Sequence, residues 1–192
     1  MIPRRLALVA GLAVAVAAVA WVVVNSKRTP HYDAAARAAW QEVERQFRAR
    51  AGMVPEVIAV VEAVDPTQTA LVEQLSTTRA AVLALPPQPD APTDPARFRA
   101  FMETQDELSR ALGKVMDLMN IYSDRRSNPE IRRVLAALET QENRIVVARS
   151  DFVRLARAYN LSISSIPGRW LTRAFLGQQP LMVESFEVPS SG

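Results

Sequence analysis

The chain has no cysteine, one histidine and only six glycines in 192 residues. Without thiols it forms neither disulfides nor thiolate metal sites, although this absence suits either redox compartment. The single histidine, His31, lies at the predicted membrane boundary, so a Ser-His-Asp triad or a histidine-containing metal site cannot be assembled in the helical region. The Glu-x-x-His motifs of a di-iron bundle are also absent from the sequence. No Gly-rich phosphate loop occurs. We therefore expect no catalytic, cofactor-binding or metal-binding residues and no enzyme activity.

A basic surface of the kind that binds nucleic acid is also missing from most of the chain. Of the 23 Lys and Arg residues, four flank an N-terminal apolar segment: Arg4, Arg5, Lys27 and Arg28. The other 19 are balanced by 20 Asp and Glu. We therefore expect no binding to DNA or RNA, and we place the excess positive charge at lipid headgroups.

The apolar segment Leu6–Val24 contains nineteen consecutive residues without a charge. As a helix it is roughly 28 Å long, close to the roughly 30 Å of a bilayer core. A signal peptide cleaved after Ala18–Ala20 is the alternative, but Trp21–Val24 prolongs the apolar run beyond the usual length. We therefore predict an uncleaved signal anchor over residues 1–28, in contact with the bilayer through residues 6–24.

The sequence gives only a weak signal for the orientation of this anchor in the membrane. Basic residues are nearly equal in number on its two sides, so the positive-inside rule does not decide the topology. A long domain that follows a single anchor can be translocated regardless of modest charge. We favour a C-terminal domain outside the cytoplasm.

Apolar residues repeat at helical spacing in four further stretches. The first covers residues 32–64 and contains Pro55, where we expect a kink. The second covers residues 67–85. The third and fourth begin at Asp94-Pro95 and Asn128-Pro129, each an N-cap residue followed by proline at the first helical position.

These four amphipathic stretches, without a strand signal between them, can bury their apolar faces only against one another. We therefore predict an all-α chain, with one N-terminal transmembrane helix followed by an elongated antiparallel four-helix bundle and a short C-terminal helix. The bundle domain occupies residues 29–177, and residues 178–192 form a tail. Residues 86–95 contain five prolines and are predicted to be an extended connector without helix; a ligand for a proline-binding module is the less favoured interpretation.

Charged side chains interrupt two of the apolar stripes. Burying a lone charge is costly, so we expect the residues concerned to form a buried polar network that fixes which helices pair and in which register. Its predicted members are Arg50, Glu142, Asn143 and Arg144, with Gln105 as a further helper. The alternative is that each charged side chain extends to the edge of the bundle.

A short segment near the C-terminus is amphipathic. If it is helical, Trp170, Leu171 and Phe175 share one face, and Arg169 and Arg173 share the other. Such a helix either closes the end of the bundle, which we favour, or lies on a membrane surface.

Several motifs resemble those of one bacterial family. They are Thr140-Gln141-Glu142-Asn143-Arg144-Ile145 with Ala148-Arg149 and Tyr159-Asn160; Ala39-Trp40-Gln41-Glu42-Val43 with Arg48-Ala49-Arg50 and Met53-Val54-Pro55; and Ile166-Pro167 through Phe175 and Gly177, with Phe186-Glu187. Together they resemble the LemA family over nearly everything after Tyr32. The chain departs from the family where Gly52–Val57 replaces an element with Leu-Ile-Pro-Asn-Leu, and in its proline-rich connector.

The resemblance implies a single-pass protein of the bacterial inner (cytoplasmic) membrane with a helical-bundle domain and no established biochemical activity. Two functions fit. We favour a non-enzymatic interaction or scaffold module at the cell envelope, with an unidentified protein partner such as a membrane protease or an envelope factor. The alternative is membrane remodelling or organelle biogenesis, in which the C-terminal amphipathic segment also contacts lipid. The oligomeric state stays open, because Gly11 and Ala15 form only a weak small-residue pattern.

Overall fold

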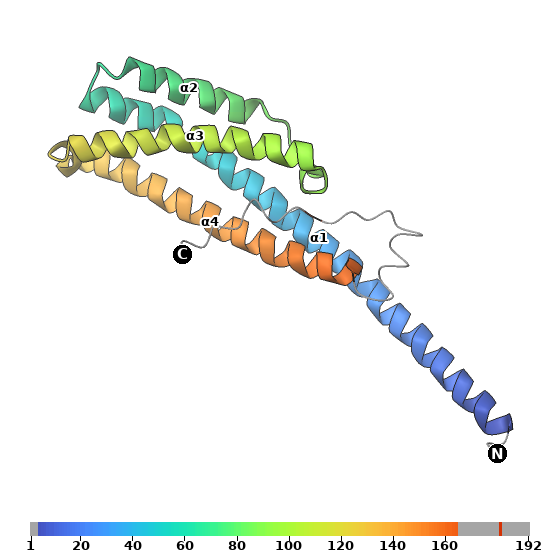
Figure 1. The fold of residues 1–192 in the computed structure, drawn as a ribbon. Coiled ribbons are helices and arrows are strands. Elements are labelled where there is room, and N and C mark those ends of the chain that lie inside the picture. Colours follow the sequence, from blue (N-terminus) through green and yellow to red (C-terminus); the bar gives the residue numbers. More distant parts are fainter. Residues whose placement is uncertain (1–3, 165–180, 182–192) are drawn as a thin grey trace, which may run out of the picture.

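The computed structural model describes residues 4–164 and Leu181, with side chains described for residues 31–164, except Arg126, and for Leu181. This part of the chain is helical and contains no strand. Its elements are α1 (Arg4–Val64), α2 (Thr69–Ala84), η1 (Ala91–Thr93), α3 (Pro95–Ile121), η2 (Arg125–Ser127) and α4 (Pro129–Ser164). Consecutive α-helices run antiparallel, so the bundle has up-down-up-down topology (Figure 1).

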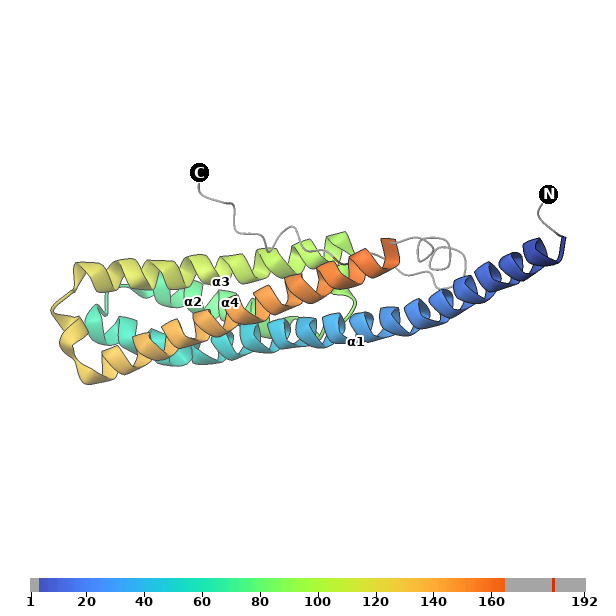
Figure 2. The same cartoon turned by 90° about the horizontal axis from the view of Figure 1, so that it is seen from below.

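Helix α1 is a single uninterrupted helix of 61 residues. The predicted start of a separate helix at residue 32 is therefore wrong, because the same helix extends back to Arg4. Pro30 and Pro55 each remove one backbone donor, but favourable helix propagation continues on both sides of each residue. The N-terminal part of α1 projects beyond the other helices, in line with the bundle (Figures 1 and 2).

The predicted membrane span, Leu6–Val24, lies outside the residues whose side chains are described. Among the residues with described side chains, no helix is long and apolar enough to cross a bilayer. The predicted C-terminal amphipathic helix falls within residues 165–180, which also lie outside the described part. Both remain predictions.

Local sequence signals predict where two of the helices begin, α3 and α4. Asp94 accepts hydrogen bonds from the backbone N–H groups of Ala96 (3.0 Å) and Arg97 (3.2 Å). Asn128 accepts one from the backbone N–H of Glu130 (2.9 Å). In each case the side chain satisfies donors that have no partner within the helix, and proline follows at the first helical position.

The proline-rich connector is fastened to α1, not merely extended. The indole of Trp40 donates a hydrogen bond to the carbonyl of Gln88 (2.8 Å), and the backbone N–H of Gln88 donates one to Glu44 (2.7 Å). Arg37 pairs with Asp90 at 2.8 Å. The expectation of no helix here is wrong, because residues 91–93 form the 3₁₀ turn η1, whose Ala91 is buried.

The apolar core consists of two clusters that follow one another along the bundle. The first cluster lies near the connections between α1 and α2 and between α3 and α4, and includes Val54, Val57, Val61, Leu75, Leu108, Val115, Met119 and Leu138. The second cluster lies nearer to the projecting end of α1 and includes Trp40, Val43, Phe47, Phe98, Phe101, Ile145, Phe152 and Tyr159. Its centre is Trp40, whose ring lies 5.0–5.6 Å from those of Phe98, Phe101 and Phe152.

Candidate functional site

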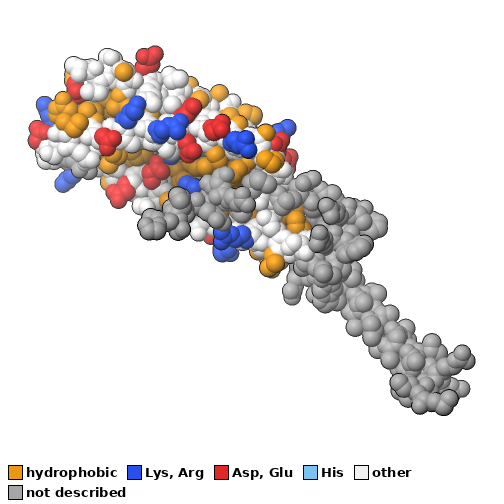
Figure 3. Space-filling model, in the orientation of Figure 1, with side chains coloured by type: hydrophobic (Ala, Val, Ile, Leu, Met, Phe, Trp, Pro, Cys, Tyr) orange, Lys and Arg blue, Asp and Glu red, His pale blue; other side chains and the backbone are white. Residues whose placement is uncertain are grey.

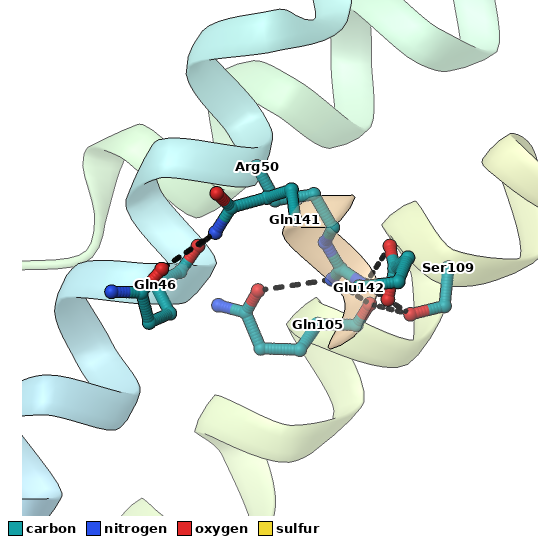
Figure 4. A network of polar contacts seen from close by, with 6 residues as sticks. All are labelled: Gln46, Arg50, Gln105, Ser109, Gln141 and Glu142. Carbon is teal, nitrogen blue, oxygen red and sulfur yellow. Dashed lines mark hydrogen bonds and ion pairs between the residues drawn. The ribbon is translucent and has the colours of Figure 1, made fainter. Parts of the chain in front are cut away.

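A layer of polar side chains separates the two apolar clusters. In α1, Arg50 follows Phe47 of the second cluster and directly precedes Ala51 of the first. Gln105 occupies the equivalent place in α3, and Gln141 does so in α4. All three are buried, with 2%, 1% and 5% exposure respectively. Three of the four long helices therefore meet in this layer (Figure 4).

Arg50 is the centre of the layer. Its guanidinium donates hydrogen bonds to Ser109 Oγ (2.8 Å), to the Gln105 carbonyl (3.0 Å) and to Glu142 Oε1 (3.3 Å). It also lies over the Phe47 ring, 5.0 Å from its centroid. A buried cation is tolerated when its donors are satisfied and an opposite charge is nearby, and this arrangement supplies both for its terminal nitrogens.

The electrostatics of the layer involve four charged groups. Burial lowers the pKa of Arg50, and the Coulomb attraction and hydrogen bond of Glu142 partly offset this. Burial also lowers the pKa of Arg149, against the opposing attraction of Asp106 and Glu142. Glu142 thus attracts two arginines, Arg50 on α1 and Arg149 on α4. Its attraction to Arg50 joins α1 to α4 by charge as well as by packing.

The predicted network is partly reproduced. Arg50, Glu142 and Gln105 come together as the sequence suggests, although Glu142 is 44% exposed. Asn143 and Arg144 are exposed, so their prediction as buried members is wrong. They lie on the outer side of α4 because its buried stripe passes through residue 141 rather than 142.

Sequence patterns alone did not identify Gln141, Gln46 and Ser109. Gln141 donates hydrogen bonds to the carbonyl (2.9 Å) and the side-chain oxygen (2.8 Å) of Gln46, again joining α4 to α1 (Figure 4). A stripe drawn three and four residues apart from Leu138 to Ile145 passes through residue 141 or 142 equally well. The sequence signal for Gln141 was therefore present but ambiguous.

An apolar groove adjoins the polar layer. It lies between α3 and α4, has a volume of about 860 Å³, and begins at the Arg50 partners Ser109 and Glu142. Its other lining residues are Leu112, Gly113, Met116, Arg132, Leu135, Ala136, Leu138 and Glu139. Figure 3 shows hydrophobic side chains gathered in a band along this face, with charged side chains on both sides.

The groove exists because α3 and α4 pack unlike the other neighbouring helices. Close backbone approaches join α1 to α4, α2 to α3 and α1 to α2, whereas α3 and α4 approach each other at very few points. Met116 is 37% exposed and lines this groove. The bundle is therefore closed on three sides and open on the fourth.

The remaining predicted site residues, Arg169, Trp170, Leu171, Arg173 and Phe175, lie outside the described part of the chain. Leu181, placed by sequence in the C-terminal tail, is 4% exposed and belongs to the second cluster. Asn160 holds its backbone by a reciprocal pair of hydrogen bonds at 2.9 and 3.0 Å. The chain therefore returns to α4 at this residue.

Within the described residues, no three His, Cys, Asp or Glu side chains are grouped closely enough to hold a metal ion. No curated protein matches the chain. The model of the LemA family matches residues 39–190, which include the whole of the bundle from Trp40 onward and the returning residue Leu181. This match covers most of the sequence, and the chain therefore belongs to the LemA family.

Proposed function

We propose that this protein is a membrane-anchored, non-enzymatic interaction module, and that the groove between α3 and α4 is where it binds another protein. The observation that carries the proposal is the open side of the bundle, where Leu112, Met116 and Leu135 line one apolar groove. Apolar surface of this kind is costly to leave in water and is typical of binding sites.

The anchor in this proposal is the apolar run Leu6–Val24. Because α1 is continuous from Arg4 to Val64, a membrane-embedded start would hold the bundle close to the membrane, with its axis set by the same helix. We place the protein in the bacterial inner membrane with the bundle outside the cytoplasm. The alternative role in membrane remodelling depends on residues 165–180, so no described contact favours it.

Two glycines provide a matched pair of variants for a test. Gly113 and Gly52 are exposed helical residues, and a Cβ atom added at either position meets nothing within 4 Å. Only Gly113 lines the groove. Gly113→Arg therefore fills the groove, whereas Gly52→Arg adds the same charge and bulk to α1 elsewhere.

The experiment is an affinity purification of the full-length protein and of both variants in mild detergent, quantified by mass spectrometry. We expect wild type and Gly52→Arg to recover the same stoichiometric protein and Gly113→Arg to recover about tenfold less of it, which corresponds to about 1.4 kcal/mol. Equal recovery by both variants, or recovery of lipid without a protein, would contradict the proposal. Circular dichroism of each variant checks that the bundle remains folded.

A further inference from the structure

We infer that the occupant of the α3–α4 groove is an amphipathic α-helix of another protein, with an acidic residue opposite Arg132 and a basic residue two helical turns away, opposite Glu139. This inference rests on the proposed function and specifies the chemistry of the partner. It is carried by the form of the groove and by the charges along it.

The form of the groove suits a helix. Its walls are two antiparallel helices, α3 and α4, whose facing residues include the small side chains Gly113 and Ala136. A helix laid between two others contacts both through residues spaced three and four apart, which is how amphipathic helices occupy apolar grooves. In this position it would occupy the open side of the bundle and cover Leu112, Met116 and Leu135.

The two ends of the groove carry charges of opposite sign on α4. Arg132 and Glu139 are seven residues apart on α4, about 10.5 Å along its axis, and both line the groove. Both are exposed, and neither has an ion-pair partner among the described residues. Glu142, by contrast, is already committed to Arg50. A partner helix with opposite charges two turns apart would match both free groups and would bind in one direction only.

The protein's own C-terminal residues are a poor match for the groove. Residues 165–180 begin at the end of α4 and must return to Leu181, which is held at Asn160. Residues 182–192 start from that same point and carry no basic side chain that could face Glu139. Glu184 and Glu187 would also add negative charge near Glu139 and Glu142.

The test is site-specific photo-crosslinking of the full-length protein in intact cells. The photoreactive residue p-benzoylphenylalanine replaces Ala136, which is exposed inside the groove, or Ala100, which is exposed on α3 outside it. Crosslinked peptides are identified by mass spectrometry. We expect position 136, but not position 100, to crosslink to a segment of another protein with apolar residues at helical spacing and an acidic and a basic residue seven positions apart.

A charge exchange tests the polarity. The double variant Arg132→Glu with Glu139→Arg keeps the composition of the groove but reverses its direction, and we expect it to lower the crosslink yield about fivefold. Reversing the two charges of the partner segment should restore the yield. The matched control, Arg99→Glu with Glu103→Arg, exchanges exposed charges on α3 outside the groove and should leave the yield unchanged.

Each alternative occupant gives a distinct result that overturns the inference. These results are a crosslink from position 136 to a second copy of this chain, to its own residues 165–192, to lipid or to a segment without the helical pattern, or no crosslink at all. An unchanged yield after the Arg132 and Glu139 exchange overturns the charge assignment. If Gly113→Arg still prevents partner recovery in that case, the proposed function stands and only this inference fails.

Discussion

Arg50 shows how strongly one side chain can constrain this bundle. Its charge is buried at 2% exposure between two apolar clusters, with Ser109, Gln105 and Glu142 as its acceptors. We expect Arg50→Ala to lower the free energy of unfolding by about 3–5 kcal/mol, because it leaves a cavity and buried acceptors without a donor. Arg50→Met fills the cavity and should cost less, about 1–2 kcal/mol.

Chemical denaturation of both variants in detergent measures these differences. A loss below about 1 kcal/mol for Arg50→Ala would show that water replaces the guanidinium without penalty, and that the layer does not depend on this residue. Arg144→Ala is the control, because Arg144 is exposed and its replacement should change stability by less than about 0.5 kcal/mol.

Replacing either of two glycines by alanine is expected to stabilise the fold. Gly52 and Gly113 lie within helices, and a Cβ atom added at either position has no neighbour within 4 Å. Alanine at either site reduces the entropy of the unfolded chain without a clash, so each replacement should raise the free energy of unfolding by about 0.5–1 kcal/mol. Thermal denaturation of the single and double variants measures this, and a decrease at either site would contradict the open surroundings seen there.

At the scale of elements, the turn between α1 and α2 depends on Asp65. Its carboxylate accepts hydrogen bonds from the Gln68 side chain, from the side chain and backbone of Thr67, and from the Tyr122 hydroxyl at the end of α3. These bonds favour the charged form and lower the pKa of Asp65 to about 2. One ionised side chain thus holds the α1–α2 turn and joins it to α3.

A lowered pKa in the folded state means that ionised Asp65 stabilises the fold above the pKa of the unfolded chain, about 3.9. This contribution is lost as the pH falls through about 2. We therefore expect Asp65→Asn to be less stable than wild type at pH 6, with a difference that shrinks between pH 4 and pH 2. Denaturation curves across this range test the prediction, and a difference independent of pH would contradict it. Asp117→Asn, on the exposed surface of α3, is the control.

The attachment of the connector to α1 gives a second element-scale prediction. Burial raises the pKa of Glu44, and the hydrogen bond from Gln88 only partly opposes this. Ionised Glu44 therefore lowers stability at neutral pH, a cost that disappears below the pKa of the unfolded chain. We expect Glu44→Gln, which still offers an oxygen to Gln88, to be at least as stable as wild type at pH 7. Glu44→Ala leaves that N–H without its acceptor and should lose about 1–3 kcal/mol.

The same denaturation measurements repeated at pH 4 separate the effect of the Glu44 charge from that of its hydrogen bond with Gln88. Any advantage of Glu44→Gln over wild type should vanish at that pH, whereas the loss in Glu44→Ala should persist. A stability of Glu44→Gln as low as that of Glu44→Ala would show that Gln88 requires the carboxylate itself.

The whole molecule shows which features local sequence patterns can predict. The starts of α3 and α4 were predictable because Asp94 and Asn128 act on donors two or three residues away. The pairing of Arg50 with Glu142 was predictable because a buried charge needs a partner. The groove was not, because it depends on how far apart α3 and α4 lie, which no periodicity within one helix determines. The continuity of α1 through Pro30 was missed because the cost of one proline was overestimated.

The orientation of the protein in the membrane can be tested by labelling an introduced cysteine. No other thiol in this sequence would react, because the sequence contains no cysteine. We expect Ala100→Cys, exposed on α3, to react with a membrane-impermeant maleimide in cells whose inner membrane is intact, about as fully as after lysis. A cysteine that reacts only after lysis would place the bundle in the cytoplasm and would restrict the helical partner to proteins of that compartment. A cysteine at residue 2 is the internal comparison: if Leu6–Val24 crosses the membrane once, the two sites must show opposite accessibility.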